Sequence, residues 1–406
     1  MTPEGDGGAA ANRPAAPLAG IRVVDLTRLL PGDFATWILA DLGAEVIKVE
    51  DTGAGDYMRW MPPMAGHSSA MYWALNRGKR AIRLDLKQPA GHEVLSRLVA
   101  SADVLVEGFR PGVMARLGLG YQALREINPA LVYCAITGYG QDGPLQQRAG
   151  HDLLYNSLAG LQGLTGTADG ELALPGFQVA DLGAGGMGGA LSVLAALLRR
   201  ERDPQRRGAF LDVSMFDGVS AFIAPQMARH LAGQLQPAPD RETSGPGVMH
   251  LNGRFPCYRM YRAGDGRWMA LAALEPKFWR AFCTLVDRPD LVPRQFDETA
   301  EMLTEMRALF AARTRQQWEQ LAAGGEVMLE PVNDLGEAAG HPQTVARGLL
   351  VDVAGELPQP APVVRFEEGY RADTRVADQG EDTDAVLAEL GYSADQLTRL
   401  RESGVV

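Results

Sequence analysis

Two residues in the first half of the chain have types and surroundings suited to moving protons. His151 follows a polar, turn-rich run over residues 138–148, and a histidine can act as a general base near neutral pH. Asp181 stands just before Gly183-Ala184-Gly185-Gly186, which opens a long apolar segment. Free amides at a helix start can stabilise an enolate or oxyanion while a nearby carboxyl carries the proton. Each residue is therefore a candidate for acid–base chemistry.

Both positions also have simpler structural explanations. Asp181 can be the N-cap of the helix, since aspartate is common there, and the glycines can allow close helix packing. His151 can be a surface-loop or helix-capping histidine. On the residue pattern alone, these structural roles are favoured.

Signals for a metal or a nucleotide cofactor are weak. A formal GxGxxG occurs at Gly183, Gly185 and Gly188, but it lies deep in the chain and lacks the acid that follows at a strand end in a dinucleotide fingerprint. The six histidines show no HxH or HExxH spacing, and the three cysteines form no CxxC. We expect no metal site, no disulfide framework and no permanently bound cofactor, and a reducing cytosol as the location.

Basic residues gather at two places. Arg77, Lys79 and Arg80 form a cluster, and Arg110 stands alone between Gly108-Phe109 and Pro111-Gly112. Either place could contact phosphates, although the usual explanation of such a run is a solvated face.

The composition limits the classes of partner. The chain has 406 residues, 46% of them apolar, and its 39 basic against 50 acidic residues leave a net charge of −11. This is enough apolar material for sizeable cores and argues against a nucleic-acid surface. Residues 184–198 are too short to span a bilayer, which takes about 18–20 apolar residues, so no membrane partner is expected. Residues 1–16 lack the apolar core of a signal peptide and are predicted to be a frayed tail.

The elements that must position these residues alternate between strand and helix in the first half. Predicted strands cover 21–26, 46–49, 80–86, 104–106, 131–136 and 210–213, and predicted helices include 31–42, the segment around 94–99, and 184–202. Such alternation predicts βαβ units and a mostly parallel sheet. The loop that carries His151 follows a strand of this series, and ligands bind at such loops in open α/β sheets.

The second half has a different texture. Residues 235–256 are rich in Pro, Gly and Ser and are predicted to be a linker or long loop. A strand at 268–271, a helix at 277–286 and a capping box at Thr314 then indicate a smaller α+β unit. A second capping box at Ser393 opens a helix in the tail.

Several stretches together carry a family resemblance. They are Leu18–Leu26, Ala40–Glu50, Asn76–Arg80, Glu107–Val113 and Thr137–Pro144. Over about residues 17–405 the chain resembles the family III CoA-transferases. Gly150-His151-Asp152-Leu153-Leu154-Tyr155 and Ala273-Leu274-Glu275-Pro276-Lys277-Phe278 resemble, within that family, the racemases of α-methylacyl-CoA.

The resemblance implies an α/β fold with a large, doubly wound, Rossmann-like domain and a smaller α+β domain. The large CoA-binding domain would comprise 17–217 with 345–406, the small domain 251–330, and linkers 218–250 and 331–344. Two chains would interlock as a homodimer, with the acyl-CoA site between the large domain of one chain and the small domain of its partner.

The resemblance also implies roles for the candidate residues. Transferases of the family use one Asp as nucleophile, at the position of Asp181. The racemases use it as an acid/base instead, opposite the His of Gly-His-Asp, here His151. Glu275 would orient the imidazole, as a carboxylate does in a triad, and the amides of Gly183 and Gly185 would face the enolate oxygen.

Coenzyme A would enter only as part of the acyl-CoA substrate. The positions that the resemblance assigns to binding CoA or substrate are Lys48, Leu84, Asp85, Leu86, Lys87, Gly108, Phe109, Arg110, Arg116, Gly150, Asp152 and Tyr155. One departure is Asp51, where the racemases carry an Arg thought to contact a CoA phosphate. Lys48, or Arg77 and Lys79, would have to replace it.

The leading hypothesis is an epimerase that inverts the α-carbon of a 2-methylacyl-CoA, or a similar 2-substituted acyl-CoA, by 1,1-proton transfer. A CoA-transferase that moves CoA between carboxylic acids through an adduct on Asp181 is the first alternative. A non-catalytic acyl-CoA binding protein that kept the fold is the second.

Overall fold

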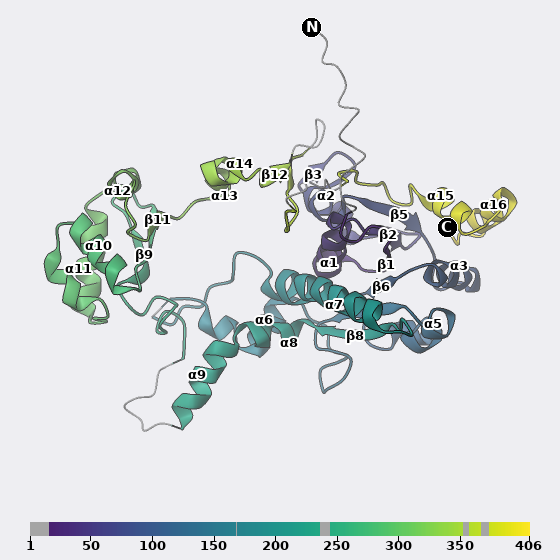
Figure 1. The fold of residues 1–406 in the computed structure, drawn as a ribbon, viewed down its shortest axis with the longest axis horizontal. Coiled ribbons are helices and arrows are strands. Elements are labelled where there is room, and N and C mark those ends of the chain that lie inside the picture. Colours follow the sequence, from purple (N-terminus) through teal and green to yellow (C-terminus); the bar gives the residue numbers. More distant parts are fainter. Residues whose placement is uncertain (1–15, 168, 236–243, 352–356, 367–372) are drawn as a thin grey trace, which may run out of the picture. The chain divides into compact units, whose positions relative to one another are not determined.

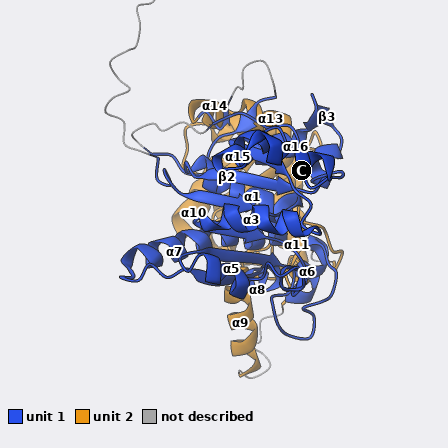
Figure 2. Cartoon of the chain, turned by 90° about the vertical axis from the view of Figure 1, so that its right-hand side faces the viewer, with its two compact units in different colours: residues 1–159, 177–221, 348–406 blue, residues 160–176, 222–347 orange. Residues whose placement is uncertain are grey.

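The computed structural model describes residues 16–167, 169–235, 244–351, 357–366 and 373–406 (Figure 1). Contacts within the chain divide it into two compact units, coloured separately in Figure 2. Unit 1 is formed by residues 1–159, 177–221 and 348–406, and unit 2 by residues 160–176 and 222–347. The predicted tail 1–16 lies, apart from its last residue, outside the described residues.

Unit 1 is built on a six-stranded sheet in which every pair of neighbours is parallel. Its strands are β1 (Arg22–Asp25), β2 (Glu45–Glu50), β5 (Lys79–Arg83), β6 (Val104–Glu107), β7 (Val132–Thr137) and β8 (Ala209–Ser214). The spatial order is β5-β2-β1-β6-β7-β8. The order reverses between β1 and β6, which creates a crevice at their carboxyl ends.

Successive strand residues point to opposite faces, so each strand supplies two cores. Val23, Val104 and Val132 pack on one face, and Val24, Leu105 and Tyr133 on the other. The first face is covered by α1 (Leu29–Asp41), α2 (Ala70–Asn76) and α7 (Gly188–Arg202). The second is covered by α3 (Pro89–Ala100), α5 (Tyr121–Ile127), α15 (Thr383–Glu389) and α16 (Ala394–Glu402). The predicted α/β class with a mostly parallel sheet is confirmed.

The last residues of the chain complete unit 1. The N–H of Gly78 donates to the carbonyl of Arg375, and the N–H of Asp85 donates to that of Val405. Val386, Leu387 and Val405 are buried in the second core. The edge of the sheet at β5 is thus covered by residues that follow unit 2 in the sequence.

A 24-residue helix crosses unit 1 over residues 179–202. Its first part, η4 (Val179–Met187), is a π-helix, and α7 continues it. By length and composition alone it could cross a membrane. Because it packs on α1, β7 and β8, we interpret it as a core helix of the unit.

The smaller elements of unit 1 lie mostly in the connections. They are η2 (Tyr57–Trp60), α4 (Val113–Arg116), α6 (Asp152–Ala159), α8 (Met215–Phe222) and the short hairpin strands β3 (Met64–Ala65), β4 (Ser68–Ser69), β12 (Leu350–Val351) and β13 (Gln359–Pro360). The first residue of α6 directly follows His151.

Unit 2 contains a three-stranded antiparallel sheet of order β11-β10-β9, formed by β9 (Tyr258–Arg262), β10 (Trp268–Ala272) and β11 (Leu329–Pro331). Its helices are η3 (Gln162–Leu164), α9 (Ala224–Gln234), α10 (Pro276–Leu285), η6 (Pro289–Arg294), α11 (Ala300–Ala311), α12 (Arg315–Ala322), α13 (Leu335–Gly340) and α14 (Pro342–Ala346). Trp279, Phe310 and Trp318 anchor its core. The predicted capping boxes at Thr314 and Ser393 are both formed.

Two predicted linkers contain regular structure. Residues 218–234 of the linker 218–250 belong mainly to α8 and α9, and 236–243 lie outside the described residues. Residues 331–344 include α13, which a capping box at Asp334 opens, and most of α14. Residues 160–176, assigned by sequence to the large domain, make their contacts within unit 2.

Candidate active site

A pocket of about 310 Å³ lies at the carboxyl end of the parallel sheet in unit 1. Its walls come from the loops that follow β1, β6 and β7, and from Met215 at the end of β8. This is the crevice that the strand order creates between β1 and β6. Among the predicted site residues, it brings together Gly108, Phe109, Arg110, Gly150, His151 and Tyr155.

The loop after β1 is held in a strained conformation. Leu29 has φ +64°, which is rare for a residue with a side chain, and its N–H donates to the Asp56 carboxylate. Lys48 in turn binds Asp56 at 2.9 Å. This chain of contacts fixes the backbone beside Arg28, a lining residue of the pocket.

Tyr155 forms a rigid wall of the pocket, and two glycines make room for its ring. A Cβ at Gly138 or at Gly150 would lie 2.5 Å from the Tyr155 ring, so only glycine fits at either position. The ring of Tyr139 meets that of Tyr155 edge-on with centroids 5.0 Å apart. Gly150, the residue directly before His151, therefore determines how the Tyr155 ring packs.

His151 lies on the loop that enters α6, and its side chain is exposed. Its carbonyl accepts the N–H of Leu154 at 2.8 Å, which anchors the start of the helix. Asp152, the residue after His151, accepts the N–H of Asp181 at 3.1 Å. The two predicted acid–base residues are thus brought close together, although they are separated in sequence and lie on different elements.

Asp181 occupies the first turn of η4 and is not its N-cap, which is Gln178. Its carboxylate forms no hydrogen bond or salt bridge with any residue that the structure describes. Burial, and next the charge of Asp152, raise the pKa of Asp181 to about 6, while His151 acts in the opposite direction. Asp181 can therefore hold or release a proton near neutral pH, which suits an acid–base role.

The Tyr155 hydroxyl is influenced by the charges of both Asp181 and Arg110. Burial, and next the charge of Asp181, raise the pKa of the Tyr155 hydroxyl, while Arg110 acts in the opposite direction. The hydroxyl therefore stays protonated and can donate a hydrogen bond beside Asp181.

The glycines after Asp181 serve packing more than ligand binding. A Cβ at Gly185 would lie 2.9 Å from Met215, and one at Gly186 would lie 2.7 Å from Phe34. Gly185 is buried in the seventh position of η4, past the first turn with its free N–H groups. Gly183 lies nearer the helix start and is half-buried. The expectation that the Gly185 amide faces an enolate is corrected to close packing of η4 on α1 and α8.

Lys48 is not available to a CoA phosphate. It is fully buried, with Nζ 2.5 Å from Asp33 Oδ1 and 2.9 Å from Asp56 Oδ2. Burial alone would lower the pKa of Lys48, but the charges of Asp33 and Asp56 raise it well above its usual value. The predicted role of Lys48 in binding CoA is therefore wrong in this structure.

The cluster Arg77, Lys79 and Arg80 is equally committed to internal partners. Arg77 is buried and pairs with Asp41 at 2.5 Å, and Lys79 is buried beside Asp25. Arg80 pairs with Glu45 and Glu389. The cluster therefore does not offer its charges to a phosphate, and it does not form the solvated face that was the other expectation.

Several other predicted binding residues lie away from the pocket. Leu84 is buried in the core after β5, and the Asp85 carboxylate accepts hydrogen bonds from Lys87 N–H and Gln88. Leu86 is half-buried, Lys87 is exposed, and Arg116 is exposed at the end of α4. Asp51 is exposed and accepts the N–H of Gly53. None of these residues lines the pocket.

Glu275 belongs to unit 2. It is the exposed N-cap of α10, and its carboxylate makes no cap hydrogen bond. Pro276 follows at the first helical position, which is typical of a helix start. Its role toward His151 stays a prediction.

Sequence reasoning missed several lining residues, notably Arg28, Gln146 and Arg148. The guanidinium groups of Arg110 and Arg148 form no hydrogen bond or ion pair with any residue that the structure describes. Arg28 contacts the hydroxyl of Tyr57 at 3.2 Å. Its position directly after β1 was the available signal, since ligand loops follow strand ends.

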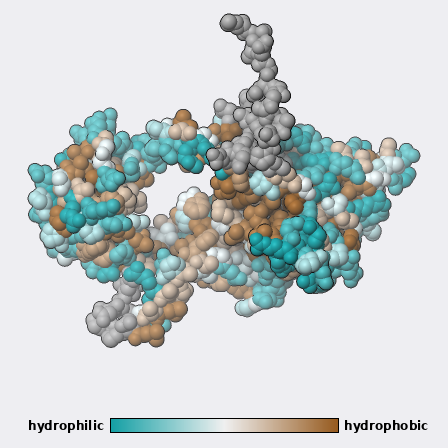
Figure 3. Space-filling view, in the orientation of Figure 1, coloured by the Kyte–Doolittle hydropathy of each residue, from teal (hydrophilic) through white to brown (hydrophobic). Residues whose placement is uncertain are grey.

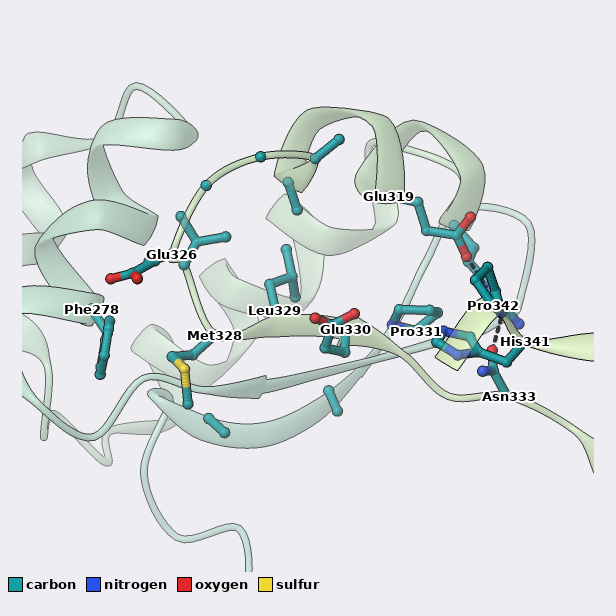
Figure 4. Close-up of a pocket in the computed structure, with 18 of the residues that line it drawn as sticks. Phe278, Glu319, Glu326, Met328, Leu329, Glu330, Pro331, Asn333, His341 and Pro342 are labelled. Carbon is teal, nitrogen blue, oxygen red and sulfur yellow. Dashed lines mark hydrogen bonds and ion pairs between the residues drawn. The ribbon is translucent and has the colours of Figure 1, made fainter. Parts of the chain in front are cut away.

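A larger pocket, of about 1180 Å³, lies in unit 2 between β11, α12 and the start of α14 (Figure 4). Its walls carry Glu319, Glu326, Glu330 and Glu337, and the Arg315 guanidinium is already bound to Glu319 and Glu337. An acidic wall repels phosphates, so this pocket is a poor candidate for CoA. Across the described parts of both units, no group of three or more His, Cys, Asp or Glu side chains could hold a metal ion.

Comparison with known proteins decides the family. Residues 18–383 match the model of CoA-transferase family III. The chain belongs to CoA-transferase family III. The family III fold is also found in a CAIB/BAIF family protein from Brucella suis, whose crystal structure covers 93% of this chain and 100% of its own at 32% identity and a TM-score of 0.80.

Curated members of family III are similar along nearly the whole chain. A human succinyl-CoA:glutarate CoA-transferase is 33% identical over 405 residues, which cover 96% of this chain and 90% of that protein. A human alpha-methylacyl-CoA racemase is also 33% identical, over 395 residues that cover 96% of this chain and 97% of that protein. Overall identity therefore does not separate the two chemistries, and the site residues must.

Proposed function

We propose that this family III enzyme is a racemase or epimerase that inverts the α-carbon of a 2-methylacyl-CoA, or a similarly 2-substituted acyl-CoA, by 1,1-proton transfer. The observation that carries the proposal is the pairing of His151 with Asp181, whose pKa is raised to about 6. Inversion needs one group that removes a proton and one that returns a proton on the opposite side. A carboxyl that ionises near neutral pH suits this exchange better than one that is permanently charged.

In one direction, the neutral imidazole of His151 takes the α-proton, and the electrons of the C–H bond move into the thioester carbonyl to give a planar enolate. The protonated Asp181 then donates its proton to the other face of the α-carbon, and the enolate collapses to the thioester. The reverse reaction starts with ionised Asp181 and protonated His151. Each turnover therefore exchanges one proton with the enzyme and leaves the acyl-CoA otherwise unchanged.

The enolate oxygen needs hydrogen-bond donors, and the start of α6 offers them. The first N–H groups of a helix have no acceptor within it, and α6 begins at Asp152, next to the imidazole. These amides are better placed than that of Gly185, which is packed inside η4. We propose that they stabilise the oxygen as charge develops.

Deuterium exchange tests the proposal. The wild-type enzyme should exchange the α-proton of both enantiomers of a 2-methylacyl-CoA in D2O. In His151→Ala, exchange should be lost for the enantiomer whose proton faces His151 and should persist for the other, because Asp181 remains. An absence of exchange across a panel of 2-methylacyl-CoAs would exclude the proposal.

A CoA-transferase is the second candidate, and the arginines of the pocket favour it. Guanidinium groups recognise carboxylates, and Arg110 and Arg148 have no protein partner that the structure describes. The similar human enzyme is named for succinyl-CoA and glutarate, both of which carry carboxylates. Ionised Asp181 would then attack the thioester carbonyl, and cleavage of the C–S bond would give an acyl anhydride on Asp181 and release the CoA thiolate. Hydroxylamine would trap the resulting acyl or CoA adduct on Asp181, which a proton-transfer enzyme does not form.

We further propose that the protein acts as a homodimer. Large apolar side chains are exposed on helices of each unit: Leu153, Leu154 and Leu158 of α6 and Leu191 and Leu198 of α7 in unit 1, and Met227 and Leu231 of α9 in unit 2. Apolar residues are visible along α9 in Figure 3. Light scattering should give twice the mass of 43.7 kDa. A stable, active monomer would contradict the proposal.

A further inference from the structure

The Asp152 carboxylate is used entirely inside the protein, not for a ligand. Its Oδ1 accepts the N–H groups of Ala180 at 2.6 Å and of Asp181 at 3.1 Å. Its Oδ2 accepts from Nδ2 of Asn156 at 2.6 Å, and Asn156 is completely buried. The sequence resemblance assigned Asp152 to CoA or substrate binding. These contacts occupy its carboxylate within the protein, so only its N–H, at the start of α6, is left for the substrate contact proposed above.

These contacts link two elements that are far apart in the sequence. Asp152 is the backbone neighbour of His151 and the first residue of α6, and it caps the start of η4, whose first turn carries Asp181. We propose that Asp152 is a positioning residue that sets the separation of His151 and Asp181 by fastening the start of η4 to the start of α6. This inference rests on the proposed function, because it assumes that His151 and Asp181 act together on one substrate.

The charge of Asp152 gives the link a second effect. After burial, it is the main cause that raises the pKa of Asp181. The other titratable groups facing Asp181 are His151 and Tyr155. The acids of α1 and β8, which also pack against η4, have partners of their own. Lys48 pairs with Asp33, Arg77 pairs with Asp41, and Asp212 accepts the Gln141 N–H.

The two effects can be separated, because Asn156 offers a spare acceptor. Its buried Oδ1 has no hydrogen-bond partner. In Asp152→Asn, the new Oδ1 can still accept the Ala180 and Asp181 N–H groups, while a flipped Asn156 amide accepts from the new Nδ2. Asp152→Asn therefore removes the charge and keeps the cap, whereas Asp152→Ala removes both.

The experiment measures two quantities in wild type, Asp152→Asn, Asp152→Ala and Asp217→Asn. The first is the pH profile of α-proton exchange in D2O, for the enantiomer whose proton Asp181 removes. The second is the titration of the Asp181 carboxyl carbon by NMR, in enzyme labelled with [4-13C]aspartate and assigned with Asp181→Asn. Asp217 is an exposed acid on α8, so its variant controls for the loss of one negative charge.

In Asp152→Asn, we expect the Asp181 titration and the acid limb of the exchange profile to move together to lower pH, with a much smaller fall in kcat than in Asp152→Ala. In Asp152→Ala, kcat should fall about a hundredfold, as for a displacement of reacting groups of about 1 Å. Asp217→Asn should change neither quantity.

An Asp181 titration in Asp152→Asn that matches wild type, or a folded Asp152→Ala enzyme with wild-type kcat, would overturn the inference. If Asp152→Ala does not fold, Asp152→Ser takes its place, since its short hydroxyl cannot reproduce the contacts to the Ala180 and Asp181 N–H groups and the same fall in kcat is expected. A wild-type enzyme without exchange would instead refute the proposed function, and the NMR titration would still report on Asp152.

Discussion

Two sets of charged side chains lie near the carboxyl end of the same sheet. One set forms ion pairs within the protein, and the other has no partner among the described residues. Under α1, Lys48 and Lys79 are buried among Asp25, Asp33 and Asp56, with ion-pair distances between 2.5 and 3.8 Å. In the pocket, the guanidinium groups of Arg110 and Arg148 have no protein partner among the described residues, and the Asp181 carboxylate, which is not one of the residues lining the pocket, has none either.

The difference distinguishes charges that stabilise the fold from charges that can act on a ligand. The buried set holds the strained loop at Leu29 through Asp56, and its charges are used up within the fold. The pocket set keeps its charge available to a ligand. In this chain, therefore, a basic residue at a strand end is a candidate for a phosphate or carboxylate contact only if no acid of the same core pairs with it.

Lys48→Met should produce the largest effect and break the supporting set. Removal of the ammonium leaves Asp33 and Asp56 buried without their main cation, and the loss of one partner of a buried pair costs about 3–5 kcal/mol of unfolding free energy. Urea unfolding measures the effect. Lys87→Met, at an exposed site, should stay within about 0.5 kcal/mol of wild type. Equal stabilities for the two variants would contradict the structural role of Lys48.

Asp181→Asn tests the opposite case, a half-buried acid that pairs with no cation among the described residues. Because the folded-state pKa is raised to about 6, the wild type is penalised for ionising Asp181 as the pH rises through that value. The variant should thus be more stable than wild type at pH 8, by up to about 3 kcal/mol, and the gain should shrink toward pH 5. Urea unfolding at both pH values checks this, and a gain that is larger at pH 5 would reverse the assigned shift.

Arg148→Gln should leave folding intact and weaken the binding of the ligand. We expect KM for an acyl-CoA to rise about tenfold, as for a lost hydrogen bond to a charged group, with little change in the unfolding midpoint. Comparison of substrates with and without a second carboxylate, alongside inhibition by free CoA, shows which anion the arginine meets. An unchanged KM with every substrate would remove Arg148 from the binding set.

The smallest effect is expected at the partly exposed pairs of Arg80. Its guanidinium lies 2.8 Å from both Glu45 and Glu389, but water screens these contacts. A double-mutant cycle of Arg80→Met and Glu389→Gln should give about 0.2–1 kcal/mol. A coupling as large as the effect of Lys48→Met would abolish the distinction between the buried network and the partly exposed pairs.

The sequence predicted the sheet and most of its helices, because strands such as Val132–Thr137 and helix faces such as Val94, Leu95 and Leu98 carry clear apolar patterns. For His151 and Asp181 the residue pattern alone favoured structural roles, and the motifs of the family resemblance turned both into predicted catalytic residues. The apolar patterns and the motifs are local in the sequence, so they can be recognised without knowing which distant residues each one contacts.

The sequence could not predict which charges are paired. Lys48 finds Asp33 and Asp56 on segments 15 and 8 residues away, and Asp152 binds the backbone of Asp181 across 29 residues. No pattern in the printed sequence marks these partners. The roles of Lys48, Gly185 and the Asp152 carboxylate were misassigned for the same reason, because each depends on a contact between distant segments.

The covering of β5 by residues 373–406 has a consequence for how the protein is made. Unit 2 interrupts the chain of unit 1, so a ribosome releases all of unit 2 before it synthesises Val386, Leu387 and Val405. At cellular rates of synthesis, roughly 10–40 seconds pass between the synthesis of β8 and that of the residue at 405. During that time the second face of the sheet lacks part of its cover. We therefore expect chaperones to bind the nascent chain. Loss of the final residues would leave the second face of the newly made sheet partly uncovered.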